Sequence, residues 1–274
     1  MTTEAAPPEA PEEAVEQEEP EGGQMTLLEH LLELRSRVMW MSIAILGGML
    51  IFFLPPIGFR FIDVLLEPGR QAVPDFRPQF IEPMENVFVY FRMALLGGIT
   101  VAMPVVVYHI LRFITPALTR NEKRWIFPIV FGSTFAFIGG LAFAYFVVLP
   151  LAFGFLLTFG TEFARPDLRI DRYMSFVIRL LLVLGLVFQT PLLILALAKF
   201  RLVTWRKLIG WWRYAVVIAF IVAAIATPTI DPVTQTLVAG PIIILYGVGI
   251  VLAWLVQRNS IDDEEDAEAP TAAR

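Results

Sequence analysis

Two glutamates in this sequence lie among arginines and lysines, where a carboxylate has a clear chemical use. Glu33 lies in the segment ELRSR and Glu122 in the segment TRNEKR. A carboxylate accepts a guanidinium through two parallel hydrogen bonds, so two such carboxylates can receive two arginines of a ligand. The simpler interpretation is local charge balance within two base-rich segments. The residues alone leave both interpretations open.

The residue types needed for most enzymatic and cofactor chemistry are missing. The chain has no cysteine and only two histidines, His30 and His109, which argues against disulfides, thiol catalysis and histidine-based metal sites. No Walker A, GxGxxG, HExxH or GxSxG motif occurs. We therefore predict that the protein is not an enzyme and has no cofactor, no metal and no nucleic-acid partner.

Some polar residues lie inside long apolar runs, where a polar side chain is costly and therefore a candidate for function. Arg92 and Arg179 each lie a short way inside the end of a run, and snorkelling to the membrane interface is the simpler interpretation. Gln189 lies deeper and precedes Thr190-Pro191. Three roles are open for its amide: it satisfies a carbonyl freed by the proline, it bonds to a neighbouring helix, or it contacts a ligand.

A further polar group surrounds a turn near the end of the chain. Thr227 and Gln235 flank this turn, which contains Asp231. Capping and turn chemistry are the simpler roles for such residues.

Long apolar runs must position these residues. The chain is 57% hydrophobic, with a mean hydropathy of +0.69, whereas soluble domains are about 45–50% apolar. We predict an all-α polytopic integral membrane protein with six transmembrane helices. Their expected positions are residues 38–57, 87–111, 125–149, 174–200, 214–226 and 236–256.

The fifth and sixth spans are expected to be short. Residues 214–226 would form a helix about 20 Å long, against a hydrocarbon core of about 30 Å. Pro241 is a candidate first-turn residue of the sixth span. Two short spans predict a thinned bilayer or a tilted pocket, and a re-entrant hairpin is the alternative.

The connections differ in charge and in length. Thr26 and Glu29 form a capping-box pattern that opens an amphipathic helix, either lying on the membrane surface or continuing into the first span. Twelve bases fall on the side of the two termini, and six fall on the longer loops 58–86 and 150–173, which we expect to cap the other face. The positive-inside rule places both termini in the cytoplasm and the protein in the cytoplasmic membrane.

The acidity of the chain is confined to its tails. Residues 1–24 contain eight Glu and no base, and residues 259–274 contain six acids and one Arg, whereas residues 25–258 carry 20 bases and 12 acids. We expect both tails to be disordered, because they contain too few large apolar residues to offset the ordering entropy. The predicted organisation is a membrane domain at 25–258 between two disordered acidic tails.

Several segments in this order resemble the TatC family, the polytopic subunit of the twin-arginine protein translocase. They are HLLELRSR (30–37), FITPALTRNEKR (113–124), FAYFVVLPLAFGFL (143–156), GLVFQTP (185–191) and TPTIDPVTQTLVAGP (227–241). The resemblance implies a receptor that binds the twin-arginine signal peptide of a folded cargo protein. It also implies assembly with TatA/TatB-type single-span subunits, a homo-oligomer within the complex, contact with membrane lipids and transport driven by the proton-motive force.

The resemblance assigns roles to particular positions of this chain. It implies signal-peptide binding by Glu33, Arg35, Arg37, Phe113, Arg120, Glu122 and Arg124. Partner docking or intramembrane polar roles are implied for Gln189, Thr227 and Gln235, and outer-face roles for Pro68 and Asp231. This chain departs from the pattern at Gln189, where some members carry a glutamate, so a proton carrier at that position is in doubt.

Two other classes of function remain as alternatives. A secondary transporter or channel for small solutes would be expected to show internal repeats and mid-span charges, and neither is evident. A membrane scaffold would gather single-span proteins without binding signal peptides.

Overall fold

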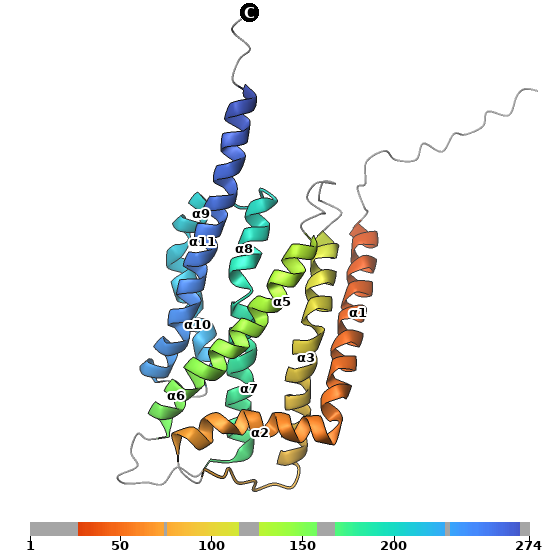
Figure 1. The fold of residues 1–274 in the computed structure, drawn as a ribbon, viewed down its shortest axis with the longest axis vertical. Coiled ribbons are helices and arrows are strands. Elements are labelled where there is room, and N and C mark those ends of the chain that lie inside the picture. The colour runs from red at the N-terminus through yellow and green to blue at the C-terminus, as the bar shows by residue number, and fades with distance from the viewer. Residues whose placement is uncertain (1–26, 74–75, 115–125, 158–167, 228–230, 269–274) are drawn as a thin grey trace, which may run out of the picture.

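The computed structural model describes residues 27–73, 76–114, 126–157, 168–227 and 231–268. Within these ranges the regular elements are helices, apart from an isolated bridge between Gln79 and Arg169. The helices are α1 (Leu27–Phe53), α2 (Pro55–Ala72), α3 (Glu85–Ile114), α5 (Ile126–Phe143), the π-helix η2 (Ala144–Val148), α6 (Leu149–Leu156), α7 (Ile170–Val187), α8 (Thr190–Lys199), α9 (Trp205–Gly210), α10 (Trp212–Ala226) and α11 (Pro232–Glu268) (Figure 1).

Five helical stretches are long and apolar enough to cross a membrane. They are Leu28–Phe53, Glu85–Phe113, Ile126–Leu156, Ile170–Lys199 and Pro232–Arg258, and the shorter apolar helix α10 is the sixth apolar segment. The polytopic all-α prediction is therefore confirmed. α1 begins at Leu27 without a break before the first span, so the amphipathic segment is an extension of that span and not a separate surface helix.

The prediction of a short sixth span is wrong. The spanning stretch of α11 has 27 residues and begins at Pro232, because Pro232 and not Pro241 occupies the first turn. The Asp231 carboxylate accepts a hydrogen bond from the backbone N–H of Thr234 at 2.6 Å and so caps the helix. Pro241 lies inside the helix, as membrane helices tolerate. α11 also continues to Glu268, past the expected start of the tail at 259.

The fifth apolar helix is short, as predicted. α10 contains 15 residues, which correspond to a length of about 22 Å. Its ends are Trp212 and Ala226.

One end of the bundle is covered by α2, which lies across the long helices (Figure 1). Pro55 and Pro56 end the first span and begin this helix, because proline fits the first turn. α2 buries Leu65, Leu66 and Pro68 against the bundle. The predicted cap over this face is thus mainly a helix. We call this end of the molecule the α2 end.

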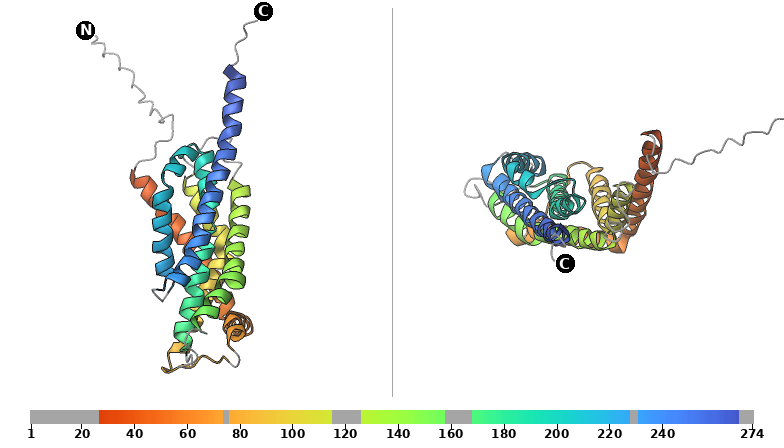
Figure 2. Two further views of the ribbon diagram at one scale, coloured as in Figure 1. Left: turned by 90° about the vertical axis from the view of Figure 1, so that its left-hand side faces the viewer. Right: turned by 90° about the horizontal axis from the view of Figure 1, so that it is seen from above.

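The opposite end holds the start of α1 and the end of α11, so both lie at the same end of the bundle (Figure 1). We call it the terminal end. Seen from above, α1 stands at one side of the molecule and α9 and α10 at the other, with α3 and α7–α8 between them (Figure 2).

The main core lies between α3, α6, α7 and the side of α2 that faces the bundle. Met93, Leu149, Met174 and Leu180 are completely buried there. α1 contributes little to this core, since only 6% of its spanning window is buried. It is held instead against α3 by two facing glycines: a Cβ on Gly48 would lie 2.7 Å from the carbonyl oxygen of Gly98. Small residues of this kind let two membrane helices approach closely.

Candidate functional site: a charged and aromatic cluster at the terminal end

Glu33 and Arg37 form an ion pair on α1 at the terminal end. Arg37 Nη2 donates to Glu33 Oε1 at 2.8 Å, and the side chains are only 17% and 18% exposed. They lie four residues apart and therefore on the same face of the helix. Glu33 Oε2 and Arg37 Nε are buried and have no hydrogen-bond partner among the described residues. The pair therefore keeps hydrogen-bonding capacity for a further group.

An aromatic contact joins α1 to α3 beside this pair. The rings of His30 and Phe113 are stacked, with centroids 4.3 Å apart and an angle of 20° between their planes. Phe113 ends the apolar stretch of α3, and the segment that contains Glu122 follows directly in the sequence. The stacking therefore fixes the start of α1 against the origin of that segment.

α3 adds two further polar groups at this end. Arg112 donates to the hydroxyl of Tyr108 at 2.8 Å and lies over the Tyr108 ring. His109 Nδ1 is buried without a partner among the described residues. We define His30, Glu33, Arg37, His109 and Phe113 as the terminal-end cluster.

The structure brings together only part of the predicted signal-peptide site. Glu33, Arg37 and Phe113 belong to the cluster, whereas Arg35 is exposed on α1. The predictions for Arg120, Glu122 and Arg124 lie outside the described residues. His30 and His109 were missed as members of the site, although helical spacing places His30 with Glu33 and His109 with Phe113.

Gln189 lies at the break between α7 and α8. Its amide Nε2 donates to the carbonyl oxygen of Ser133 on α5 at 2.8 Å. Pro191 follows in the first turn of α8. Of the predicted possibilities, the structure therefore contains the bond to a neighbouring helix.

The polar residues around the turn before α11 have local partners. The hydroxyl of Thr227 is buried and donates to the carbonyl oxygen of Ala223 at 3.0 Å. Gln235 Nε2 donates to the carbonyl oxygen of Phe220 at 3.2 Å and so ties α11 to α10. Asp231 caps α11, as described above. The contacts of Thr227 and Asp231 fit the simpler interpretation of capping and turn chemistry, whereas the contact of Gln235 joins two helices.

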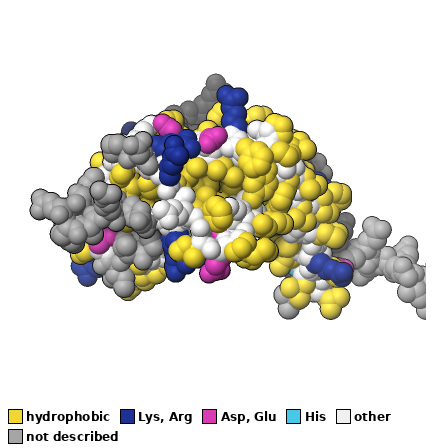
Figure 3. Space-filling view, turned by 90° about the horizontal axis from the view of Figure 1, so that it is seen from below, with side chains coloured by type: hydrophobic (Ala, Val, Ile, Leu, Met, Phe, Trp, Pro, Cys, Tyr) yellow, Lys and Arg dark blue, Asp and Glu magenta, His cyan; other side chains and the backbone are white. Residues whose placement is uncertain are grey.

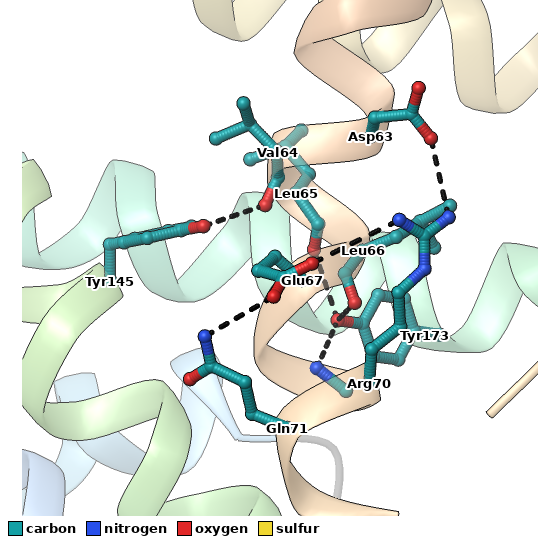
Figure 4. Close-up of polar contacts among 10 residues, drawn as sticks. Asp63, Val64, Leu65, Leu66, Glu67, Arg70, Gln71, Tyr145 and Tyr173 are labelled. Atoms are coloured by element: carbon teal, nitrogen blue, oxygen red, sulfur yellow. Dashed lines mark hydrogen bonds and ion pairs between the residues drawn. The ribbon is translucent and has the colours of Figure 1, made fainter. Parts of the chain in front are cut away.

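Pro68 is buried within α2, where it interrupts the backbone hydrogen bonding of the helix. A proline at 68 cannot donate to the carbonyl oxygen of Val64, which instead accepts from the hydroxyl of Tyr145 at 2.8 Å. The hydroxyl of Tyr173 lies between the neighbouring backbone groups. It accepts from the N–H of Gly69 at 3.0 Å and donates to the carbonyl oxygen of Leu65 at 3.0 Å (Figure 4).

A side chain that sequence reasoning missed organises the connection from α8 to α9. Gln257 on α11 accepts from the backbone N–H of Trp205 at 3.1 Å and donates to the carbonyl oxygen of Val203 at 2.8 Å. Tyr246 donates to the carbonyl oxygen of Leu208 at 2.8 Å. No sequence signal marks these contacts, because they join residues 38 to 54 positions apart.

In the part of the chain that the structure describes, no three His, Asp or Glu side chains come together as metal ligands. The terminal-end cluster presents charged and aromatic side chains.

Comparisons with known proteins give the family of this chain. A family model described as "Sec-independent protein translocase protein (TatC)" matches residues 29–241. The TatC protein of Aquifex aeolicus is 38% identical over 238 residues, which cover 86% of this chain and 97% of that protein. The chloroplastic TATC of Arabidopsis thaliana is 36% identical over 254 residues, which cover 88% and 69%.

The fold agrees with this relationship. A crystal structure of the twin-arginine translocase receptor TatC matches with a TM-score of 0.75 and 38% identity, over 84% of this chain and 100% of that chain. The family resemblance of the sequence is thereby confirmed, and this chain belongs to the TatC family of Sec-independent protein translocase proteins.

Proposed function

We propose that this protein is the signal-peptide receptor of a twin-arginine translocase and that Glu33 and Glu122 bind the two arginines of the signal. As a TatC-family member, the chain is a subunit of the Sec-independent, twin-arginine translocase. The proposed receptor acts on folded cargo proteins and uses the proton-motive force. The chain itself has no catalytic role in this scheme.

The observation that carries the proposal is the state of Glu33. Its carboxylate is mostly buried, is held by Arg37 at 2.8 Å and keeps one oxygen without a partner among the described residues. An arginine of a ligand would complete the hydrogen bonding of that oxygen, and a charge-assisted bond of this kind contributes about 1.5–3 kcal/mol. Arg37 keeps the carboxylate in place before the ligand arrives.

The distribution of basic residues supports access of a signal peptide from the cytoplasm to the terminal-end cluster. The start of α1 and the end of α11 lie at the same end (Figure 1), and Arg35, Arg112, Arg206 and Arg213 are exposed on segments near it. The positive-inside rule assigns this end to the cytoplasm and the α2 end to the opposite side. We accordingly propose a multi-pass protein of the cytoplasmic membrane.

Single-span partner subunits of the TatA/TatB type are proposed to dock along α10. This helix is shorter than the membrane core and exposes Val217, Ile218, Ile221 and Ile225, so a partner helix would cover an apolar face there. Gln235, which bonds to the Phe220 carbonyl, lies beside it. The working assembly would also contain further copies of this chain and bound lipids.

The test is peptide binding to the full chain in lipid nanodiscs. We expect Glu122→Ala to weaken binding of a twin-arginine signal peptide about tenfold or more, and Glu122→Arg to weaken it further through repulsion. A twin-lysine peptide should bind weakly to the unmodified chain, because an ammonium lacks the planar donor fork. Glu67→Ala, on α2 at the opposite end of the bundle, is the control. Unchanged affinity of inserted Glu122→Ala would remove this site assignment.

A further inference from the structure

A hollow with three arginines opens at the α2 end, away from the terminal-end cluster. It has a volume of about 550 Å³ and lies between α3 and α7. We call it the arginine hollow. Among its lining residues are Arg92, Asp171, Arg172, Ser175, Arg179 and Leu182. Figure 3 looks onto this end and shows basic and acidic side chains gathered close to exposed hydrophobic ones.

The charges in the arginine hollow do not cancel. Arg92 Nη1 pairs with Asp171 Oδ1 at 2.6 Å and with the hydroxyl of Ser175 at 2.5 Å. Arg179 makes only a 3.4 Å contact with the carbonyl oxygen of Ile225, and Arg172 has no ion-pair partner among the described residues. Three guanidiniums face one carboxylate, so the lining carries two uncompensated positive charges.

An apolar groove adjoins the arginine hollow. It has a volume of about 400 Å³ and is lined almost entirely by apolar side chains of α1, α3, α5 and α7–α8. Leu182 lines both the hollow and the groove. On α3 the wall passes from Arg92 and Leu95 in the hollow to Ile99 and Met103 in the groove, at spacings of three and four residues that keep one helix face.

The combined surface is longer than one lipid leaflet. On α3 its lining runs from Arg92 in the hollow to Leu111 in the groove, which is about 28 Å at 1.5 Å per residue, whereas half of the hydrocarbon core is about 15 Å. The acyl chains of a lipid whose headgroup lies in the hollow would therefore occupy the part of the groove next to it, around Ile99 and Leu182.

We propose that the arginine hollow binds the phosphate of an anionic phospholipid whose acyl chains lie along the apolar groove. Arg172 and Arg179 hold the phosphate, and Arg92 is kept in position by Asp171. A phosphodiester accepts guanidinium donors as a carboxylate does. The two uncompensated charges favour an anionic headgroup over a zwitterionic one. The ligand belongs to the leaflet on the α2 side.

Native mass spectrometry of the full chain, stripped of lipid in mild detergent, tests this assignment. The probes are phosphatidylglycerol, a diacylglycerol with the same acyl chains, and inorganic phosphate. We expect phosphatidylglycerol to bind about tenfold more tightly than the diacylglycerol and to resist competition by inorganic phosphate. Equal binding of the two lipids, or displacement by inorganic phosphate at matched concentration, would overturn the proposal.

Variants distinguish binding in the arginine hollow from a general attraction between anionic lipids and basic side chains. Arg172→Gln and the double variant Arg172→Gln/Arg179→Gln should lose the preference for phosphatidylglycerol. Arg60→Gln should keep it, because Arg60 is exposed on α2 and does not line the hollow. A photoreactive residue in place of Leu95 should crosslink to lipid in the membrane. Crosslinking to a partner helix or to a second copy instead, or an unaltered preference in the double variant, would refute the assignment.

Discussion

Glu33 and Arg37 form a 2.8 Å ion pair one helical turn apart, and each keeps a buried polar atom without a partner among the described residues. A pair of charges four residues apart in a helix contributes only about 0.3–0.5 kcal/mol to stability. We propose that the unused oxygen of Glu33 accepts a hydrogen bond from a ligand and that Arg37 holds the carboxylate in position for it.

Replacing Glu33 by Gln should therefore affect ligand binding more than stability. The variant keeps the size of the side chain but loses the charge that attracts a guanidinium. We expect the Kd for a twin-arginine signal peptide to rise about tenfold or more, with the thermal unfolding midpoint nearly unchanged. Isothermal titration in nanodiscs measures the first quantity and differential scanning fluorimetry the second. Glu67→Gln, on α2 at the opposite end of the bundle, is the control. Equal affinities of Glu33→Gln and the unmodified chain would contradict a role for Glu33 as a receptor.

Tyr173→Phe should destabilise the cap at the α2 end. The Tyr173 hydroxyl links the N–H of Gly69 with the carbonyl oxygen of Leu65, and the side chain is 2% exposed. Its removal leaves buried backbone groups without that partner, which costs about 1–3 kcal/mol. Unfolding in mixed micelles with increasing sodium dodecyl sulfate measures the change in the free energy of unfolding.

Tyr145→Phe is the matched comparison for Tyr173→Phe. Its hydroxyl contacts only the carbonyl oxygen of Val64 and lies in a more exposed position, where water or lipid headgroups replace the lost donor. We expect a smaller loss, of about 1 kcal/mol or less. A larger loss for Tyr145→Phe than for Tyr173→Phe would show that the stability of α2 around Pro68 depends mainly on the bond to Val64 and not on the Tyr173 hydroxyl.

Sequence patterns predicted the spans better than the contacts between them. Hydropathy located the long apolar helices because bilayer thickness fixes their length. The sixth span was placed wrongly because Pro241 resembled a helix start, whereas the start is made by Asp231 and Pro232. A local pattern does not distinguish a first-turn proline from one that a long membrane helix tolerates.

The candidate site was predicted in its residue types but not in its geometry. The base-rich segment around Glu33 left cation recognition and local charge balance both open, and the structure adds Arg37 as the partner of Glu33. The stacking of His30 on Phe113 joins positions 83 residues apart, which no local pattern reveals. For the same reason the contacts of Tyr173 and Gln257 appeared only with the fold.

Gln257→Leu should loosen the connection between α8 and α9 at the terminal end. Leucine fills a similar volume but neither accepts from the Trp205 N–H nor donates to the Val203 carbonyl oxygen. We expect the amide of Trp205 to exchange with deuterium about tenfold faster, as measured by hydrogen-exchange mass spectrometry. Gln71→Leu is the control, since Gln71 bonds only to Glu67 at the α2 end. Unchanged exchange at Trp205 would mean that packing alone orders this connection.

Two neighbouring glycines give a test of how α1 is held against α3. A Cβ on Gly48 would lie 2.7 Å from the carbonyl oxygen of Gly98, whereas a Cβ on Gly47 would meet nothing within 4 Å. Gly48→Ala should therefore push the helices apart, lower the unfolding midpoint and weaken twin-arginine peptide binding, because α1 carries Glu33 and α3 carries Phe113. Gly47→Ala, with the same chemical change on the same helix, should leave both properties intact. Equal behaviour of the two variants, in unfolding and in peptide binding, would show that the position of Glu33 does not depend on this close approach.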